Sequence, residues 1–154
     1  MIRLMQEKDL DMVAAIEAAC IRQPWSRKSF AESLEKEYSL FLVAEEDERI
    51  CGYIGLYLTY EDAEITGIAV LPEKRRGGRG KELLEQAVKY VEKKGVQRIL
   101  LEVRRSNDTA QAFYQNLGFE DMGIRPNFYD FPKEDAILMQ LQISDIRKNI
   151  VLGR

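Results

Sequence analysis

Residues Ile65–Leu84 read ITGIAVLPEKRRGGRGKELL and combine three local patterns in one order. Ile65–Leu71 is rich in β-branched and apolar residues, which favours a strand, and Pro72 ends it because proline has no N–H to donate to a sheet. A basic segment with three glycines follows, and from Leu83 onward the apolar residues recur with the spacing of an amphipathic helix that Gly95 is placed to end. The segment therefore predicts a strand, a tight turn and a helix.

The turn between this strand and helix has the features of an anion-binding site. Unpaired backbone N–H groups and the positive end of a helix dipole both favour a negatively charged ligand at such a junction. The side chains agree, because Glu73–Glu82 holds five basic residues and only two glutamates in a chain whose formal net charge is −3. A charge run alone is more often a solvated loop, but the combined pattern favours a phosphate-binding loop. The residues expected to contact the phosphate are Arg75, Arg76, Gly77, Gly78, Arg79, Gly80 and Lys81.

Two common phosphate-binding motifs do not fit this turn. A P-loop requires Ser or Thr where Glu82 stands, and a dinucleotide-binding loop requires a third glycine where Leu83 stands. The segment Arg75–Gly80, RRGGRG, instead resembles the R/Q-x-x-G-x-G/A loop with which the GNAT family of N-acetyltransferases holds the diphosphate of acetyl-coenzyme A (acetyl-CoA). In that family the loop follows a strand and opens a helix, as is expected here.

Composition narrows the chemistry that the chain can perform. Its 154 residues suit one domain, and no apolar run or signal-peptide core indicates a membrane or export, so we expect a cytoplasmic protein with no membrane partner. The chain has no histidine, which excludes Ser-His-Asp and Cys-His catalysis and the usual zinc sites, and no metal is expected. Cys20 and Cys51 lack C-x-x-C spacing and are expected to be reduced thiols. Acid–base chemistry is left to carboxylates, tyrosines, lysines or a thiol.

Strand and helix patterns alternate through the rest of the chain. Further strands are expected at Ile2–Met5, Ser39–Glu45, Ile50–Tyr60, Arg98–Val103, Phe119–Met122 and Asp135–Ile143. Further helices are expected after caps at Asp9 and Ser26 and over Asp108–Leu117, with an aromatic loop over Gly123–Lys133 and a frayed helix in the tail, Ser144–Arg154. The order β-α-α-β-β-β-α-β-α-β-β predicts a single α/β (α+β) domain over residues 1–143. Its sheet is mixed and mostly antiparallel with helices on both faces, which matches the fold of the GNAT family.

Acetyl transfer to an amine requires a base, because an α-amine with a pKa of about 7.7–8.0 is mostly protonated at neutral pH. Glu102 is the candidate, since a charge within the apolar run Ile99–Val103 is costly unless it is used or paired; a solvated glutamate or a pair with Arg104 is the alternative. Tyr114 can protonate the departing thiolate, although its spacing also suits a core aromatic. A backbone N–H near Val70 is expected to bind the oxyanion, especially if the strand bulges there.

Further motifs resemble one branch of the GNAT family, the bacterial ribosomal-protein-alanine N-acetyltransferases. In chain order they are Pro24-Trp25-Ser26, Leu101–Asn107 (LEVRRSN), Ala112-Phe113-Tyr114, Leu117-Gly118-Phe119, Arg125-x-x-x-Tyr129 and Glu134-Asp135-Ala136. The resemblance covers nearly the whole chain except the tail. The chain departs from the pattern at Phe128, where a second tyrosine is common, at Arg75, where glutamine is frequent, and at Phe113, which replaces leucine.

The resemblance implies a role for each of these positions. Glu102 would be the general base and Tyr114 the general acid, and Asn107 would hydrogen-bond the acetyl-CoA co-substrate. The backbone of Ile68, Ala69 and Val70 would hold its pantetheine arm. The acceptor would be the N-terminal amine of a small-subunit ribosomal protein, without direct contact to nucleic acid.

Two residues are expected on the acceptor side. Tyr129 follows from the resemblance, whereas Trp25 either lines the acceptor cleft or anchors the loop between two helices. Glu61, Asp62 and Glu64 either attract a basic peptide terminus or form a solvated turn. Two other functions stay open: acetylation of a small amine or a lysine side chain, and a non-catalytic domain that binds an acyl-CoA.

Overall fold

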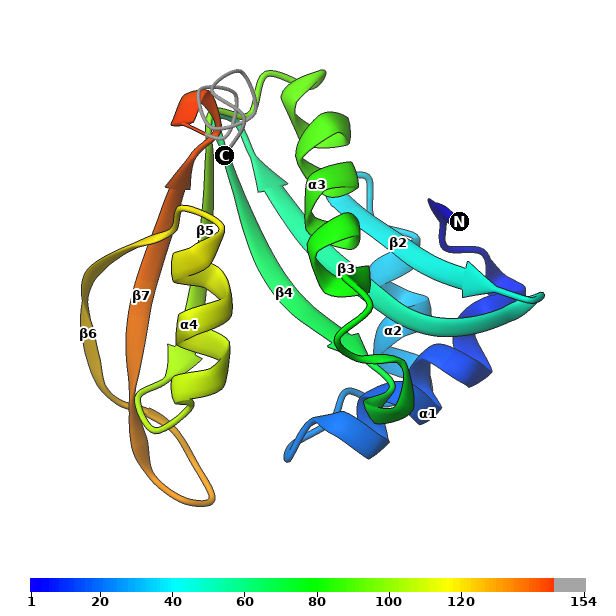
Figure 1. Ribbon diagram of the computed structural model, residues 1–154, viewed down its shortest axis with the longest axis horizontal. Coiled ribbons are helices and arrows are strands. Elements are labelled where there is room, and N and C mark those ends of the chain that lie inside the picture. The colour runs from blue at the N-terminus through cyan, green and yellow to red at the C-terminus, as the bar shows by residue number, and fades with distance from the viewer. Residues whose placement is uncertain (146–154) are drawn as a thin grey trace.

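Seven strands of the computed structural model form one sheet in the order β1-β2-β3-β4-β5-β7-β6, and the structure describes residues 1–145 (Figure 1). The strands are β1 Ile2–Leu4, β2 Ser39–Glu46, β3 Arg49–Thr59, β4 Asp62–Val70, β5 Arg98–Arg104, β6 Glu120–Tyr129 and β7 Glu134–Gln142. The helices are α1 Leu10–Cys20, α2 Arg27–Leu34, α3 Arg79–Glu92 and α4 Asp108–Asn116, with short 3₁₀ helices η1 Glu7–Asp9 and η2 Pro72–Lys74. The expected order of elements is confirmed.

The sheet divides between β4 and β5. All other neighbouring strands pair antiparallel, but β4 and β5 are parallel and pair only from Asp62 opposite Arg98 to Glu64 opposite Leu100. Figure 1 shows the two strands together at one end and diverging toward the other. The sheet is therefore mixed, as expected, and its two parts are joined along a short seam.

The part formed by β1–β4 is covered on both faces. Leu40 and Leu42 of β2 belong to the core under α3, whereas Phe41 and Val43 belong to the core under α1 and α2. This alternation follows from the two-residue period of a strand. Figure 1 shows α3 on one face and α1 with α2 on the other. Burial on both faces explains why β2 and β3 read as nearly continuous apolar runs.

The part formed by β5, β7 and β6 is covered by α4 on one face. Ile99, Leu101 and Val103 of β5 are buried in the same core as Tyr114 of α4, while the residues between them are only partly buried. Glu102 is one of the latter, so it lies on the face of β5 turned away from α4.

The predicted helix ends are largely confirmed. The Ser26 hydroxyl accepts a hydrogen bond from the Ser29 N–H (3.1 Å), and the Asn107 side chain accepts one from the Ala110 N–H (3.0 Å). Gly95 follows α3 at φ +90°, a conformation that glycine adopts without strain. Asp9 does precede α1, but its carboxylate accepts from the Gln6 N–H and from Arg3 instead of capping that helix.

The predicted aromatic loop over Gly123–Lys133 is wrong, because β6 continues to Tyr129. Glycine, proline and asparagine in this segment indicated a turn, but β6 is an edge strand, where a proline needs no ladder hydrogen bond. Its pairing with β7 shifts register twice, and all its residues except Tyr129 are exposed. The strand is therefore irregular and carries little of the apolar alternation that identifies strands in a sequence.

Two further expectations concern cysteine and the chain end. Cys20 and Cys51 are free thiols, as predicted. The helix expected in Ser144–Arg154 falls mainly on residues 146–154, which lie outside the described part. Within residues 1–145, no helix combines the length and apolar character that crossing a membrane requires.

Candidate active site

The divergence of β4 and β5 leaves one edge of β4 without a strand partner. From Ile65 to Val70 the structure pairs β4 with β3 only. Backbone N–H and C=O groups on such an edge are available to an extended ligand that takes the place of a neighbouring strand. The carbonyl of Val70 is already engaged, since it accepts from Arg75 Nε at 3.0 Å. The predicted pantetheine segment, Ile68, Ala69 and Val70, lies at this open edge.

The bulge in β4 lies at Thr66, whereas the oxyanion donor was expected near Val70. Gly67 pairs with Gly55 and Ile65 with Leu56, which leaves Thr66 without a partner on β3. A Cβ atom at Gly67 would lie 2.5 Å from the Tyr53 hydroxyl, so only glycine fits beside this phenol. The residue after the bulge is therefore in close contact with Tyr53 of β3.

Glu102 lies just beyond the point where the two strands separate. Its side chain is 16% exposed, and Arg125 Nη1 of β6 approaches its carboxylate at 3.5 Å. Burial, and then the neighbouring Glu64 carboxylate, raise the pKa of Glu102 above its usual value, while Arg125 opposes this shift. A carboxylate whose pKa is raised toward neutrality is a more effective general base.

The predicted alternative that Glu102 pairs with Arg104 is wrong. Arg104 contacts Glu134 at 3.2 Å and donates to the carbonyls of Asp130 and Pro132. Side chains two residues apart in a strand point to the same face, so Glu102 and Arg104 share one. They nevertheless meet different partners, Arg125 of β6 and Glu134 of β7. Arg104 stabilises the β6–β7 hairpin. The cation nearest to Glu102 is instead Arg125, which is more exposed and lies farther from its carboxylate partner.

Tyr114 is buried as a core aromatic, and its role as the general acid stays a prediction. Its ring packs between Phe113 (5.2 Å between centroids) and Phe119 (5.3 Å), as a core aromatic does. Its hydroxyl has no hydrogen-bond partner within residues 1–145, yet every fully buried polar side-chain atom there has one, so this oxygen reaches accessible space. Burial, and then Tyr129, raise the pKa of Tyr114, which keeps the phenol protonated.

Tyr129 connects this phenol to the carboxylate. The Arg104 guanidinium lies over its ring at 4.4 Å from the centroid. Burial, and then the Glu102 carboxylate, raise the pKa of Tyr129 to about 12. Because Tyr129 influences the pKa of Tyr114 and Glu102 that of Tyr129, these three predicted residues lie close enough for their charges to interact. A base and two protonated phenols can together transfer protons to and from a reacting group.

Trp25 lies in the loop between α1 and α2, where it has the anchoring role. Its ring packs against Phe30 (5.3 Å) and Tyr57 (6.4 Å), and its backbone N–H donates to the Glu17 carboxylate at 3.1 Å. The other oxygen of Glu17 accepts from the Tyr53 hydroxyl at 2.6 Å. The acceptor role predicted for Trp25 stays a prediction, since no ring contact or hydrogen bond in the described part joins it to Glu102.

The glycine-rich loop leads into α3 as predicted. Gly78 precedes the helix at φ +77°, and Arg76 also has a positive φ of 68°. The first helical hydrogen bond runs from the Glu82 N–H to the Gly78 carbonyl, so the preceding N–H groups of the helix are free to bind an anion. A Cβ at Gly80 would meet the Phe113 ring at 3.3 Å, which explains why this position is glycine.

The basic side chains of the loop divide into engaged and free ones. Arg75 bonds the Val70 carbonyl, and Arg79 bonds Glu46 and the Lys74 carbonyl. Arg76 is exposed, and Lys81 has only a 3.8 Å pair with Glu85. Arg76 and Lys81 are therefore the side chains best able to reach a phosphate.

Asn107 uses its side-chain oxygen to cap α4, which leaves its amide NH₂ group for the predicted contact with acetyl-CoA.

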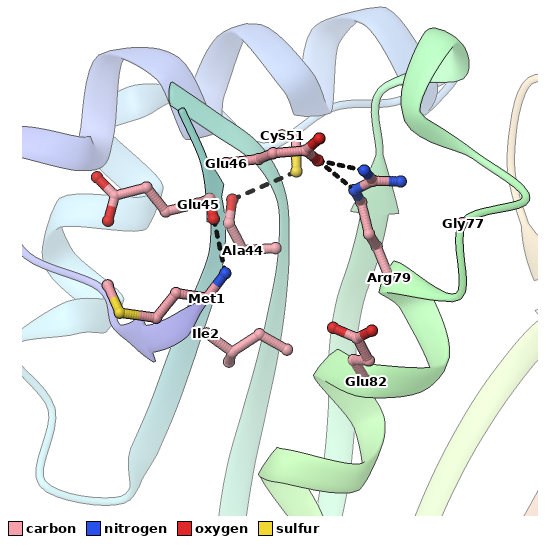
Figure 2. Close-up of a pocket in the computed structure, with 9 residues that line it drawn as sticks. All are labelled: Met1, Ile2, Ala44, Glu45, Glu46, Cys51, Gly77, Arg79 and Glu82. Carbon is pink, nitrogen blue, oxygen red and sulfur yellow. Dashed lines mark hydrogen bonds and ion pairs between the residues drawn. The ribbon is translucent and has the colours of Figure 1, made fainter. Parts of the chain in front are cut away.

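A hollow of about 190 Å³ lies between the first strands and α3, lined by Glu46 and Arg79 among others (Figure 2). It contains none of the predicted catalytic residues.

The contacts of three glutamate and arginine side chains at or near the site were not predicted from the sequence. Glu64 was assigned to a possible solvated turn but lies beside Glu102, and Glu17 was not singled out. A glutamate on the apolar face of a helix, next to Val13 and Ile16, was the available signal for Glu17, which is 5% exposed. For Arg125 only the family motif gave a signal.

The chain is similar to known acetyltransferases in sequence and in structure. The Acetyltransferase (GNAT) family matches residues 10–119. The chain belongs to this family. It is an acyltransferase and uses acetyl-CoA as its co-substrate. No group of metal-ligating side chains occurs in residues 1–145.

Individual relatives match over almost their whole length. The ribosomal protein bS18-alanine N-acetyltransferase of Escherichia coli (strain K12) is 36% identical, over 93% of this chain and 97% of its own. A Bacillus subtilis (strain 168) protein is 40% identical over 94% of this chain and 96% of its own, and its name assigns the same activity provisionally. The crystal structure of the E. coli ribosomal-protein-S18-alanine N-acetyltransferase superposes with a TM-score of 0.85 at 35% identity and covers 93% of both chains. The expected fold and subfamily resemblance are confirmed.

Proposed function

We propose that this chain transfers the acetyl group of acetyl-CoA to the N-terminal α-amine of a protein, namely the N-terminal alanine of a small-subunit ribosomal protein. The observation that carries the proposal is the position of Glu102, a partly buried carboxylate with a raised pKa at the point where β4 and β5 separate. The enzymes of known name with 36–40% identity support the choice of acceptor.

Acetyl-CoA would lie with its pantetheine arm along the open edge of β4 and its diphosphate at the N-terminus of α3. The edge offers main-chain groups over Ile65–Val70, and the loop offers free N–H groups before Glu82. The bulge at Thr66 disturbs the ladder between these ends and supplies a candidate N–H for the oxyanion. This orientation directs the thioester carbon toward β5.

Glu102 would remove the proton from the attacking ammonium group, directly or through a water. The amine nitrogen then forms a bond to the thioester carbon, and the C–S bond breaks as the tetrahedral intermediate collapses. Tyr114 would give its proton to the departing thiolate, whose conjugate acid has a pKa of about 8.5, well below that of a phenol. Proximity of both groups to the reacting atoms supplies the rate enhancement.

The acceptor side would be formed by the loop at Trp25 and by the β6–β7 hairpin near Tyr129. Glu64 and Glu102 place two carboxylates there, which favour a positively charged amine. Phe128 packs against Tyr129 at 5.0 Å between ring centroids, and it offers no hydroxyl to a substrate.

A peptide assay tests the proposal. The enzyme is incubated with acetyl-CoA and a ribosomal-protein peptide that begins with alanine and contains lysines. A second reaction uses the same peptide with a formylated N-terminus. The modified positions are mapped by mass spectrometry. We expect acetylation at the N-terminus of the first peptide and none on the second. Modification of internal lysines in both, or faster acetylation of spermidine, would contradict the proposed acceptor.

A further inference from the structure

Arg79 lies in the loop expected to bind the diphosphate, but each of its three guanidinium nitrogens already contacts another group of the protein. Its Nε donates to Glu46 Oε2 at 2.7 Å, its Nη2 contacts the same carboxylate, and its Nη1 donates to the Lys74 carbonyl at 2.9 Å. Figure 2 shows the Glu46 carboxylate turned toward this guanidinium at the start of α3. These contacts hold the guanidinium toward Glu46 and leave two of its five N–H groups for other partners.

Glu46 contacts both ends of the loop. It is the last residue of β2, and besides Arg79 it lies 3.6 Å from the Nζ atom of Lys74, which precedes the loop. An isolated surface pair contributes little, but a two-point contact to arginine combined with a second cation forms a network with defined geometry. Arg79, and then Lys74, lower the pKa of Glu46, so its carboxylate stays ionised at neutral pH.

The loop itself has few internal restraints. Arg76 and Gly78 both have positive φ angles, and no regular element spans Arg75–Gly78. A side chain at Gly77 would collide with the Arg79 guanidinium, whereas a Cβ at Gly78 would meet nothing within 4 Å. Gly77 thus makes room for Arg79, and Gly78 provides the backbone conformation. The position of the loop depends on the arginine beneath it.

We infer that Glu46 is a positioning residue for acetyl-CoA: by holding Arg79 and Lys74 it fixes the loop so that the main-chain N–H groups at the start of α3 face the diphosphate. Arg79 acts through this contact and is not itself a diphosphate ligand. The inference rests on the proposed location of the diphosphate at this loop.

Removing Glu46 should weaken acetyl-CoA binding if Glu46 positions the loop, but should strengthen it if only the charge of Glu46 matters. Loss of a negative charge beside an anion site strengthens anion binding, and it releases a guanidinium that can bind phosphate. Loss of a positioning contact weakens binding because the loop must be ordered when the ligand binds. The sign of the change in affinity therefore distinguishes the two.

The test measures the Kd for acetyl-CoA by calorimetry, which needs no acceptor. We expect Glu46→Gln to raise this Kd about tenfold, an effect of the size usual for a charge-assisted contact. Glu48→Gln removes the same charge from the same hairpin, where Glu48 has no ion pair within the described residues, and should leave the Kd within about twofold. Thermal unfolding of each variant shows that it is folded.

A double-mutant cycle makes the test specific. Arg79→Gln should weaken binding as Glu46→Gln does, and the double variant should be no weaker than either, because both remove one contact. If instead Glu46→Gln binds acetyl-CoA as tightly as the wild type or more tightly, or if the two losses add, the inference is wrong.

Kinetics with a truncated substrate separates this inference from the proposed function. S-acetylpantetheine lacks the diphosphate, so Glu46→Gln should raise the KM for acetyl-CoA while leaving its kcat, and the kcat/KM for S-acetylpantetheine, nearly unchanged. Equal losses with both substrates would overturn the inference. If the alanine peptide is not an acceptor at all, the calorimetric result still stands and only the proposed acceptor fails.

Discussion

The two parts of the sheet differ in how they are covered. In β1–β4 helices lie on both faces, and side chains such as Leu42 and Ile54 are completely buried. In β5–β7–β6 one face carries α4, the other bears Glu102 and Arg125, and the edge strand is almost wholly exposed. In the proposed function the first part provides the site for acetyl-CoA, and the second provides the base and most of the acceptor surface. The predicted chemistry lies at the seam where they meet.

Glu102→Gln provides the largest expected effect at this seam. Glutamine keeps the shape of the side chain but cannot accept a proton, so kcat should fall by about 100- to 10,000-fold. Calorimetric binding of acetyl-CoA should stay within about twofold, since the base contacts the acceptor. Turnover equal to the wild type in a peptide acetylation assay would show that another group removes the proton.

Matched isoleucine substitutions test the difference in stability. Ile54→Ala in β3 creates a cavity in a fully buried position and should lower the free energy of unfolding by about 2–5 kcal/mol. Ile124→Ala in β6, at a position 48% exposed, should cost less than about 1 kcal/mol. Urea denaturation measures both, and equal losses would show that the two parts contribute alike.

Tyr114→Phe should have a smaller effect than loss of the base. It keeps the aromatic packing against Phe113 and Phe119 but removes the proton donor. We expect kcat to fall by about 10- to 100-fold, because water can partly replace a general acid. Unchanged kcat under single-turnover conditions would leave Tyr114 as a core residue only.

The pH dependence provides the finest test of the seam. Glu64 raises the pKa of Glu102 and Arg125 lowers it, and the base acts only when deprotonated. Glu64→Gln should therefore move the acidic limb of the kcat/KM profile to lower pH, and Arg125→Gln should move it to higher pH. A shift of both variants in the same direction would contradict this assignment.

The sequence predicted features whose signals are local. The Ser26 and Asn107 caps, the turn at Gly78 and the helix that follows it depend on a few neighbouring residues, and the family motif is contained in six positions. The oxyanion donor was expected near Val70, but the bulge lies at Thr66, next to a glycine that packs against Tyr53 of another strand. A feature that depends on a distant residue leaves little trace in the local pattern.

Side-chain partners were the least predictable part. The sequence did not predict that Arg79 contacts Glu46, and a pair of Glu102 with Arg104 was an open alternative, whereas Arg104 contacts Glu134. Both contacts depend on the tertiary fold, which brings together residues 33 and 30 positions apart in the chain. Charge type alone does not specify which of several nearby carboxylates an arginine meets.

Glu17 connects the loop at Trp25, proposed to contact the acceptor, with the part of the sheet proposed to contact acetyl-CoA. One of its oxygens fixes the main chain at Trp25, and the other fixes the Tyr53 phenol that rests on Gly67 of β4. The distance between the acceptor loop and the bulged strand is thus set by the length of one buried carboxylate side chain. Shortening it by a single methylene moves the loop relative to the strand, and reacting groups tolerate misplacement of only about 1 Å before the rate falls steeply.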